Sequence, residues 1–222
     1  MPQVTVTEPA DGVVVLTLER PEKKNALSIA VRDEMSDALD LLAKDEGVKV
    51  VIITGAGDVF SAGFDLREFE RLDDDDFTQA LWASSDRWHR TLIEFPLPTI
   101  AAVNGAALAG GFDLAVMCDM RVAADSARFA HPEIAFGDVV YGPLHDLVGG
   151  AIARDLCFTG RAIDADEALR LHLVSAIVPA GELGAEAGRW AARIARAPGE
   201  ILVRTKAKAA RRAAVAGATL DL

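Results

Sequence analysis

Two glycine-containing turns carry the residues of this chain that are best suited to chemistry. The segments 60–69 and 104–113 each follow an apolar run, 50–54 and 99–103, that predicts a buried strand. Glycine lets the backbone turn sharply from such a strand into a following helix. Two turns of this kind can direct two backbone N–H groups at one point, where they would stabilise an oxyanion. The carboxylate of Asp113 lies just inside the second turn, so the pattern indicates chemistry on an acyl group.

The composition predicts a folded protein that acts on small molecules. The chain has 222 residues, of which 51% are hydrophobic and 26% charged, and this length allows one or two domains. Its formal net charge of −11 argues against general binding to nucleic acid or anionic membranes, because both need a basic surface. No secretory signal and no uninterrupted apolar run of about 20 residues is present, so we expect a cytoplasmic protein. Cys118 and Cys157 lie in apolar runs and are expected to fill the core.

The elements that must position the two turns alternate between strands and helices. The turn signal at 11–12 separates two apolar runs and predicts a β-hairpin. Ser28 is placed to cap one helix, and Asp76 is placed to cap a second, long helix that ends before Pro96. This alternation through the first two-thirds of the chain predicts an α/β layered fold, whereas the last third is predicted to be mostly helical.

Seven motifs of the chain, taken together, resemble the enoyl-CoA hydratase/isomerase (crotonase) superfamily. They occur in the order and at the spacing typical of that family, over residues 4 to about 180. They are LERPEKKNAL at 18–27, FSAGFDL at 60–66, NG at 104–105, GG at 110–111, CD at 118–119, HPE at 131–133 and LHLVS at 171–175. The resemblance implies a crotonase-like spiral of ββα units over residues 1–180. A helical C-terminal region would follow over residues 181–222, apparently shortened, because further helices of the family would begin where the chain ends.

The resemblance also implies a binding site for an acyl-CoA thioester. Matched residue by residue, the N–H groups of Phe64 and Gly110 would form the oxyanion hole, and Asp113 and Glu133 would be the catalytic carboxylates. Coenzyme A would arrive as part of the substrate, with no separate cofactor and no metal. The residues implied to contact coenzyme A are Arg20, Lys23, Lys24, Ala26, Ala62, Asp65, Leu66 and Arg67.

The aspartate at position 113 leaves the reaction open. Hydratases of the family use two glutamates to add water, and aspartate is one methylene shorter, whereas a displacement of about 1 Å can cost about 10²-fold in rate. Family members that shift a double bond in dienoyl-CoA carry an aspartate at this position and a glutamate at the second. The leading prediction is an enoyl-CoA hydratase. The alternatives are an enoyl-CoA or dienoyl-CoA double-bond isomerase and a non-catalytic acyl-CoA-binding member of the family.

The segment after Glu133 departs from the family pattern, because 136–149 is shorter than the proline- and glycine-rich stretch found there. Asp138, Tyr141 and His145 lie in this segment, and each is expected to be structural or exposed rather than catalytic. His131 is expected to anchor its loop. The resemblance further implies a homotrimer or a dimer of trimers.

Overall fold

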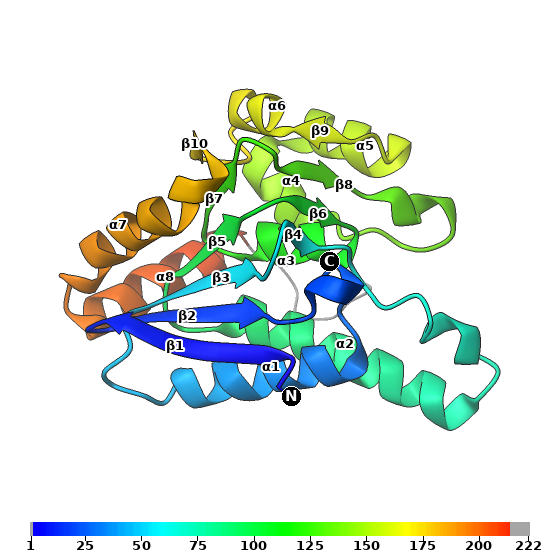
Figure 1. The fold of residues 1–222 in the computed structure, drawn as a ribbon, viewed down its shortest axis with the longest axis horizontal. Coiled ribbons are helices and arrows are strands. Elements are labelled where there is room, and N and C mark those ends of the chain that lie inside the picture. The colour runs from blue at the N-terminus through cyan, green and yellow to red at the C-terminus, as the bar shows by residue number, and fades with distance from the viewer. Residues whose placement is uncertain (1, 214–222) are drawn as a thin grey trace.

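The computed structural model describes residues 2–213, and these form ten strands and eight α-helices (Figure 1). The strands are Val4–Ala10 (β1), Val13–Leu18 (β2), Val50–Gly55 (β3), Val59–Ser61 (β4), Thr99–Val103 (β5), Ala106–Leu108 (β6), Met120–Ala124 (β7), Arg128–Ala130 (β8), Ile163–Asp164 (β9) and Ala176–Val178 (β10). The helices are Ile29–Leu42 (α1), Asp75–Glu94 (α2), Gly110–Met117 (α3), Gly142–Val148 (α4), Gly150–Thr159 (α5), Ala165–Arg170 (α6), Leu183–Ala195 (α7) and Gly199–Ala213 (α8).

The strands form two sheets that the chain visits in alternation. The large sheet has the order β1-β2-β3-β5-β7-β10, and the small sheet has the order β4-β6-β8-β9. Within the described residues, β1 pairs with β2 and β8 pairs with β9 in antiparallel fashion, whereas the other pairs are parallel. In β3-β4-α2, β5-β6-α3 and β7-β8-α4 the first strand joins the large sheet and the second joins the small one. The predicted α/β class is therefore confirmed, with a repeated ββα unit.

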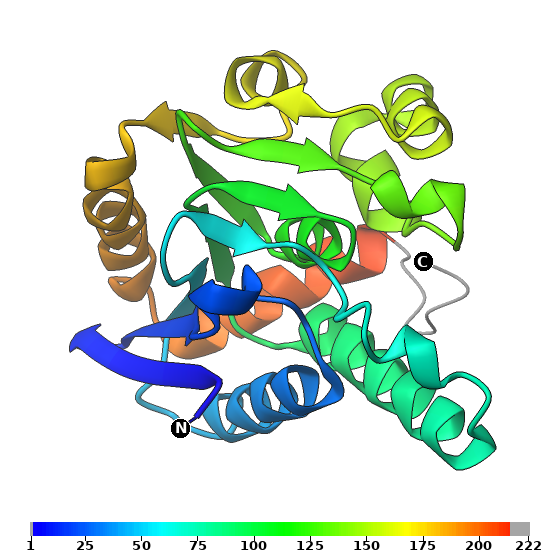
Figure 2. The same ribbon diagram turned by 45° about the vertical axis from the view of Figure 1, so that its right-hand side comes forward.

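Both faces of the large sheet are buried. On one face, Val50, Ile52 and Ile100 pack against Leu183 and Ala187 of α7. On the other face, the strands pack against α1, α2 and α3 in the main core (Figure 2). Strands covered on both faces explain the continuous apolar runs of β3 and β5.

The first two helices begin at aspartate or serine caps. Ser28 precedes α1, and its hydroxyl accepts a hydrogen bond from the backbone of that helix, as predicted. The predicted cap of α2 is wrong by two residues: Asp74 caps it, and its Oδ1 accepts from the N–H of Phe77 at 3.1 Å. The cap must precede the first helical residue, and Asp76 lies inside the first turn, where its charge favours the helix dipole instead.

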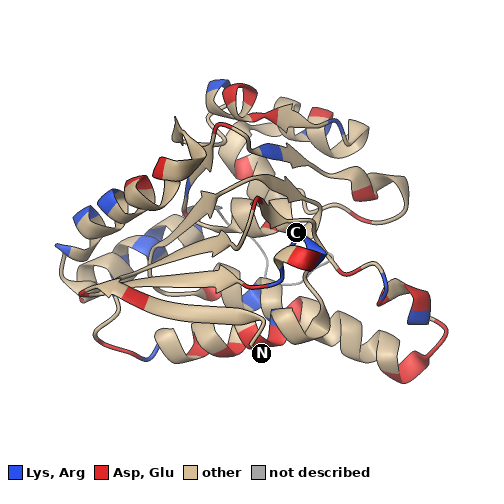
Figure 3. Cartoon of the chain, in the orientation of Figure 1, with Lys and Arg blue, Asp and Glu red and all other residues tan. Residues whose placement is uncertain are grey.

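The helical region predicted for 181–222 contains α7 and α8 as far as it is described, and residues 214–222 lie outside the described part. Acidic residues gather along α1 and at the start of α2, as Figure 3 shows, in line with the negative net charge. Across residues 2–213, every helix is too short or too polar to cross a lipid bilayer.

Candidate active site

Three segments with chemically useful groups leave the same edge of the small sheet. The strands β4, β6 and β8 are parallel neighbours, and Leu108 at the end of β6 pairs with Ala130 at the end of β8. The turn with Phe64 follows β4, the turn with Gly110 follows β6, and residues 131–133 follow β8. The topology therefore brings together three segments that are far apart in the sequence (Figure 1).

The two glycine turns are in direct contact. Gly63 has a φ of +86°, and a Cβ at this position would lie 2.7 Å from the Cβ of Ala109 and 3.0 Å from the nitrogen of Gly110. A Cβ on Gly111 would overlap the carbonyl oxygen of Ser61. The glycines are required because a side chain at either position would push the two turns apart.

The N–H groups of Phe64 and Gly110 are left without an acceptor by the described elements around them. Gly110 is the first residue of α3, and the first N–H groups of a helix have no acceptor within it. The bridge between Leu27 and Phe64 uses the N–H of Leu27, which donates to the carbonyl of Gly63 at 2.8 Å. Both predicted donors are therefore free for a ligand, and one of them lies at the positive end of a helix.

Ala109, the residue before α3, has a strained backbone. Its φ of 50° and ψ of −129° lie in a region that residues with side chains seldom adopt. The N–H of Ala109 donates to the carbonyl of Ala130 at 2.9 Å, and its own carbonyl accepts from Phe112 and Asp113 at 2.7 and 3.0 Å. These bonds hold the strained residue and orient the adjacent N–H of Gly110. The sequence analysis assigned the turn to glycines and did not predict this alanine.

Asp113 and Glu133 converge on His131. The imidazole Nδ1 lies 2.9 Å from Oε1 of Glu133 and 3.7 Å from Oδ1 of Asp113. The three side chains are only 0%, 12% and 9% exposed for His131, Glu133 and Asp113. Within the described part of the chain, Oδ1 of Asp113 and Oε2 of Glu133 have no hydrogen-bond partner, so each carboxyl keeps an oxygen for a substrate or water. His131, predicted only as a loop anchor, lies between the two carboxyls.

Burial changes the acidity of Asp113. Its desolvation raises the pKa of the carboxyl to about 7, and the charge of Glu133 adds to this rise while His131 opposes it. A carboxyl with a pKa near neutrality can both release and accept a proton under ordinary conditions. The geometry and the acidity of this pair therefore suit proton transfer.

The raised pKa of Asp113 predicts a pH-dependent stability. The folded protein keeps this proton up to about pH 7, whereas the unfolded chain releases it near pH 3.8. Between these values the folded state binds more protons, so its stability falls as the pH rises. Because asparagine stays neutral, we expect Asp113→Asn to unfold at a higher temperature than the wild type at pH 8. The difference should shrink towards pH 5 in thermal unfolding experiments, and a difference independent of pH would contradict the assignment.

The same cluster is where a metal ion would find ligands. Asp113, His131 and Glu133 each offer one ligand atom, and these atoms lie within 4.8 Å of one another. However, Nδ1 of His131 and Oε1 of Glu133 are engaged with each other at 2.9 Å, which is the length of a hydrogen bond. The contacts as they stand favour proton transfer between side chains over metal coordination.

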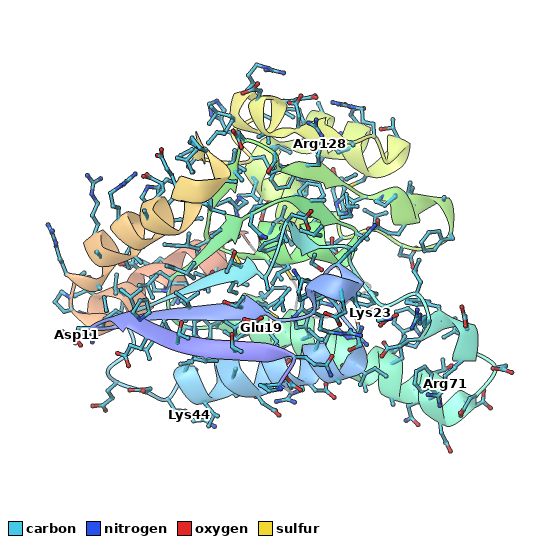
Figure 4. The ribbon with its side chains drawn as sticks, viewed as in Figure 1. Asp11, Glu19, Lys23, Lys44, Arg71 and Arg128 are labelled. Carbon is cyan, nitrogen blue, oxygen red and sulfur yellow. The ribbon has the colours of Figure 1, made fainter. Side chains whose placement is uncertain are left out.

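The residues predicted to contact coenzyme A lie in two adjoining segments. Arg20 donates to the carbonyl of Ala26 at 2.8 Å and pairs with Asp65 at 3.3 Å, and the N–H of Ala62 donates to the carbonyl of Lys24 at 3.0 Å. Lys23, labelled in Figure 4, lies on the short helix between β2 and α1. Leu66 and Arg67 are exposed. Contact of these residues with coenzyme A stays a prediction.

A pocket of about 370 Å³ adjoins the carboxyl cluster on the side of α5. It is lined by Ile134, Asp138, Val139, Tyr141, Arg154, Cys157 and Phe158. Asp138 is exposed, as expected, whereas Tyr141 and His145 are half-buried with their rings 5.5 Å apart. Cys157 is buried, as is Cys118, which agrees with the prediction that both fill the core.

Comparisons with known proteins agree on one family. Residues 8–220 match the family model described as enoyl-CoA hydratase/isomerase. A Mycobacterium tuberculosis protein named as a probable enoyl-CoA hydratase is 41% identical over 87% of this chain and 76% of its own length. A crotonyl-CoA hydratase from Syntrophomonas wolfei is 37% identical over 92% of this chain and 80% of its own. The crystal structure of an enoyl-CoA hydratase/isomerase from Xanthobacter autotrophicus Py2 superimposes with a TM-score of 0.86 at 34% identity, covering 95% of this chain and 79% of that one.

Proposed function

Because this chain belongs to the enoyl-CoA hydratase/isomerase family and has its crotonase fold, we propose that it adds water to a trans-2-enoyl-CoA. The observation that carries the proposal is the convergence of two free N–H donors and two buried carboxyls at one edge of the small sheet. Relatives named as enoyl-CoA and crotonyl-CoA hydratases support the same reaction.

In the proposed mechanism the N–H groups of Phe64 and Gly110 bind the thioester oxygen and stabilise the enolate. Glu133 takes a proton from water as the water oxygen forms a bond to the β carbon. The π electrons of the double bond move towards the carbonyl, and Asp113 donates its proton to the α carbon. One proton then moves from Glu133 to Asp113, which restores the starting state. The basic residues of the 20–26 segment would bind the phosphates of coenzyme A.

The test is an assay of purified protein with crotonyl-CoA and longer enoyl-CoA thioesters. We expect loss of the ultraviolet absorbance of the conjugated thioester and appearance of the 3-hydroxyacyl product by mass spectrometry. The absence of both, with any chain length, would overturn the hydratase assignment.

Double-bond isomerisation is the second candidate, and the aspartate at position 113 favours it. An isomerase moves one proton between carbons and can work with Glu133 alone, whereas a hydratase needs both carboxyls. Asp113→Ala should therefore abolish most hydratase activity, by about 10²-fold or more, but leave an isomerase largely active. The rates of the two variants with 2-enoyl- and 3-enoyl-CoA substrates measure the difference. Binding of coenzyme A in calorimetry without any turnover would instead indicate a non-catalytic member of the family.

A further inference from the structure

Arg32 is a fully buried cation on α1 that the proposed mechanism does not use. Its side chain is 0% exposed, and each of its three nitrogens has a partner. Nη1 donates to the carbonyl of Leu27 at 2.7 Å, Nη2 to the carbonyl of Leu81 at 3.3 Å, and Nε to the hydroxyl of Ser84 at 3.3 Å. The guanidinium therefore joins the start of α1 to the middle of α2.

The same guanidinium contacts the turn that carries Phe64. Its central carbon lies 4.3 Å from the centre of the Phe64 ring, a distance at which a cation is attracted to the ring face. Leu27, which accepts from Arg32, is the residue bridged to Phe64. Glu68, just after the turn, lies 3.8 Å from Nη2 and accepts from the N–H of Ile29 at 2.9 Å. Arg32 therefore holds the turn through a ring, a backbone bridge and a carboxylate.

A buried guanidinium is a costly way to fill this space. Burial lowers the pKa of Arg32 to about 10, with Glu68 and Asp33 opposing the change, so the group remains charged at neutral pH. Packing alone would be achieved at lower cost by an apolar side chain of similar volume. The contacts that such a side chain could not replace are the hydrogen bond to Leu27, the attraction to the Phe64 ring and the pairing with Glu68.

We propose that Arg32 is a positioning residue that fixes the N–H group of Phe64 where the thioester oxygen must bind. This inference rests on the proposed function, because it assigns the N–H of Phe64 to the oxyanion hole. Arg32 itself is covered by protein and touches no substrate, so it acts through Phe64.

The test compares Arg32→Met and Arg32→Lys with the wild type in two measurements. One is the split between kcat and KM with an enoyl-CoA substrate. The other is the fraction of bound acetoacetyl-CoA that is present as its enolate, followed by ultraviolet absorption. Because a displaced donor stabilises the enolate less, we expect kcat to fall about 10- to 10²-fold in Arg32→Met, with a smaller enolate fraction and little change in KM. Arg32→Lys keeps the charge but not the fork, and should lie between the two.

The matched control is Arg121, a second buried arginine that is 4% exposed and donates to the carbonyls of Leu173 and Cys118, both at 2.6 Å. Arg121→Lys should lower the unfolding temperature without changing kcat or the enolate fraction of the folded protein. If Arg32→Met fails to fold, Arg32→Lys against Arg121→Lys decides the question. Equal effects at the two positions, or an unchanged enolate fraction in the Arg32 variants, would overturn the inference. Failure of the wild type to bind acetoacetyl-CoA would overturn the proposed function instead.

Discussion

Replacing Glu133 with glutamine is expected to lower kcat by about 10²- to 10⁴-fold, with a much smaller effect on KM. Glutamine has nearly the same shape, and its amide oxygen can still accept the hydrogen bond from Nδ1 of His131. The amide cannot take a proton from water, so the step that activates the nucleophile is lost while substrate binding is kept. Steady-state kinetics with an enoyl-CoA thioester would measure both constants.

The control for this variant is Glu167→Gln, which neutralises a carboxylate that pairs with Arg161 at 2.8 Å, away from the cluster. It should leave kcat unchanged, because this ion pair lies partly in solvent and has no contact with the carboxyl cluster. A Glu133→Gln variant that retained more than about a tenth of the wild-type kcat would remove Glu133 from the role of base.

Gly63→Ala is expected to lower kcat/KM by about 10²- to 10³-fold, the loss associated with removing an oxyanion donor. The added methyl group would lie 2.7 Å from the Cβ of Ala109 and 3.0 Å from the nitrogen of Gly110. It must separate the two turns, and this moves both donors away from a common point. The positive φ adds strain to the same position.

Gly149→Ala separates strain from contact. Gly149 has a φ of +78°, close to that of Gly63, but a Cβ there would meet no atom within 4 Å. Both variants should lose some stability in thermal unfolding, because both force alanine into a left-handed conformation. Only Gly63→Ala should lose kcat/KM. If both lose it equally, backbone strain rather than the contact between turns explains the effect.

Much of the fold could be predicted from local patterns. The apolar runs of β3 and β5, the hairpin turn at 11–12 and the cap at Ser28 are local signals, and the structure confirms them. The cap of α2 was misplaced because four aspartates in a row, 73–76, offer equivalent side chains to any rule based on residue type. The division of the strands into two sheets could not be read from the residues alone, because it depends on long-range pairing.

The candidate site was predicted only where backbone turns and carboxylates have a recognisable spacing. Asp113 and Glu133 were expected to meet, and the structure brings them together, whereas the place of His131 between them depends on how β6 and β8 pair. Arg32 gave a signal that was not used. It lies three, four and seven residues before Met35, Ser36 and Leu39, all buried, so helical spacing places it on the core face of α1.

The parallel strands β4, β6 and β8 also act as a ruler for the substrate. Neighbouring strands in a sheet are about 4.8 Å apart, and this spacing is fixed by backbone hydrogen bonds rather than by side chains. Each strand delivers one group of the site: an N–H from the first, an N–H and a carboxyl from the second, and a carboxyl from the third. The distance from a thioester oxygen to the reacting carbons is of the same scale. The backbone of the small sheet would thus measure the head of the substrate, while the side chains around α5 would be free to vary with its tail.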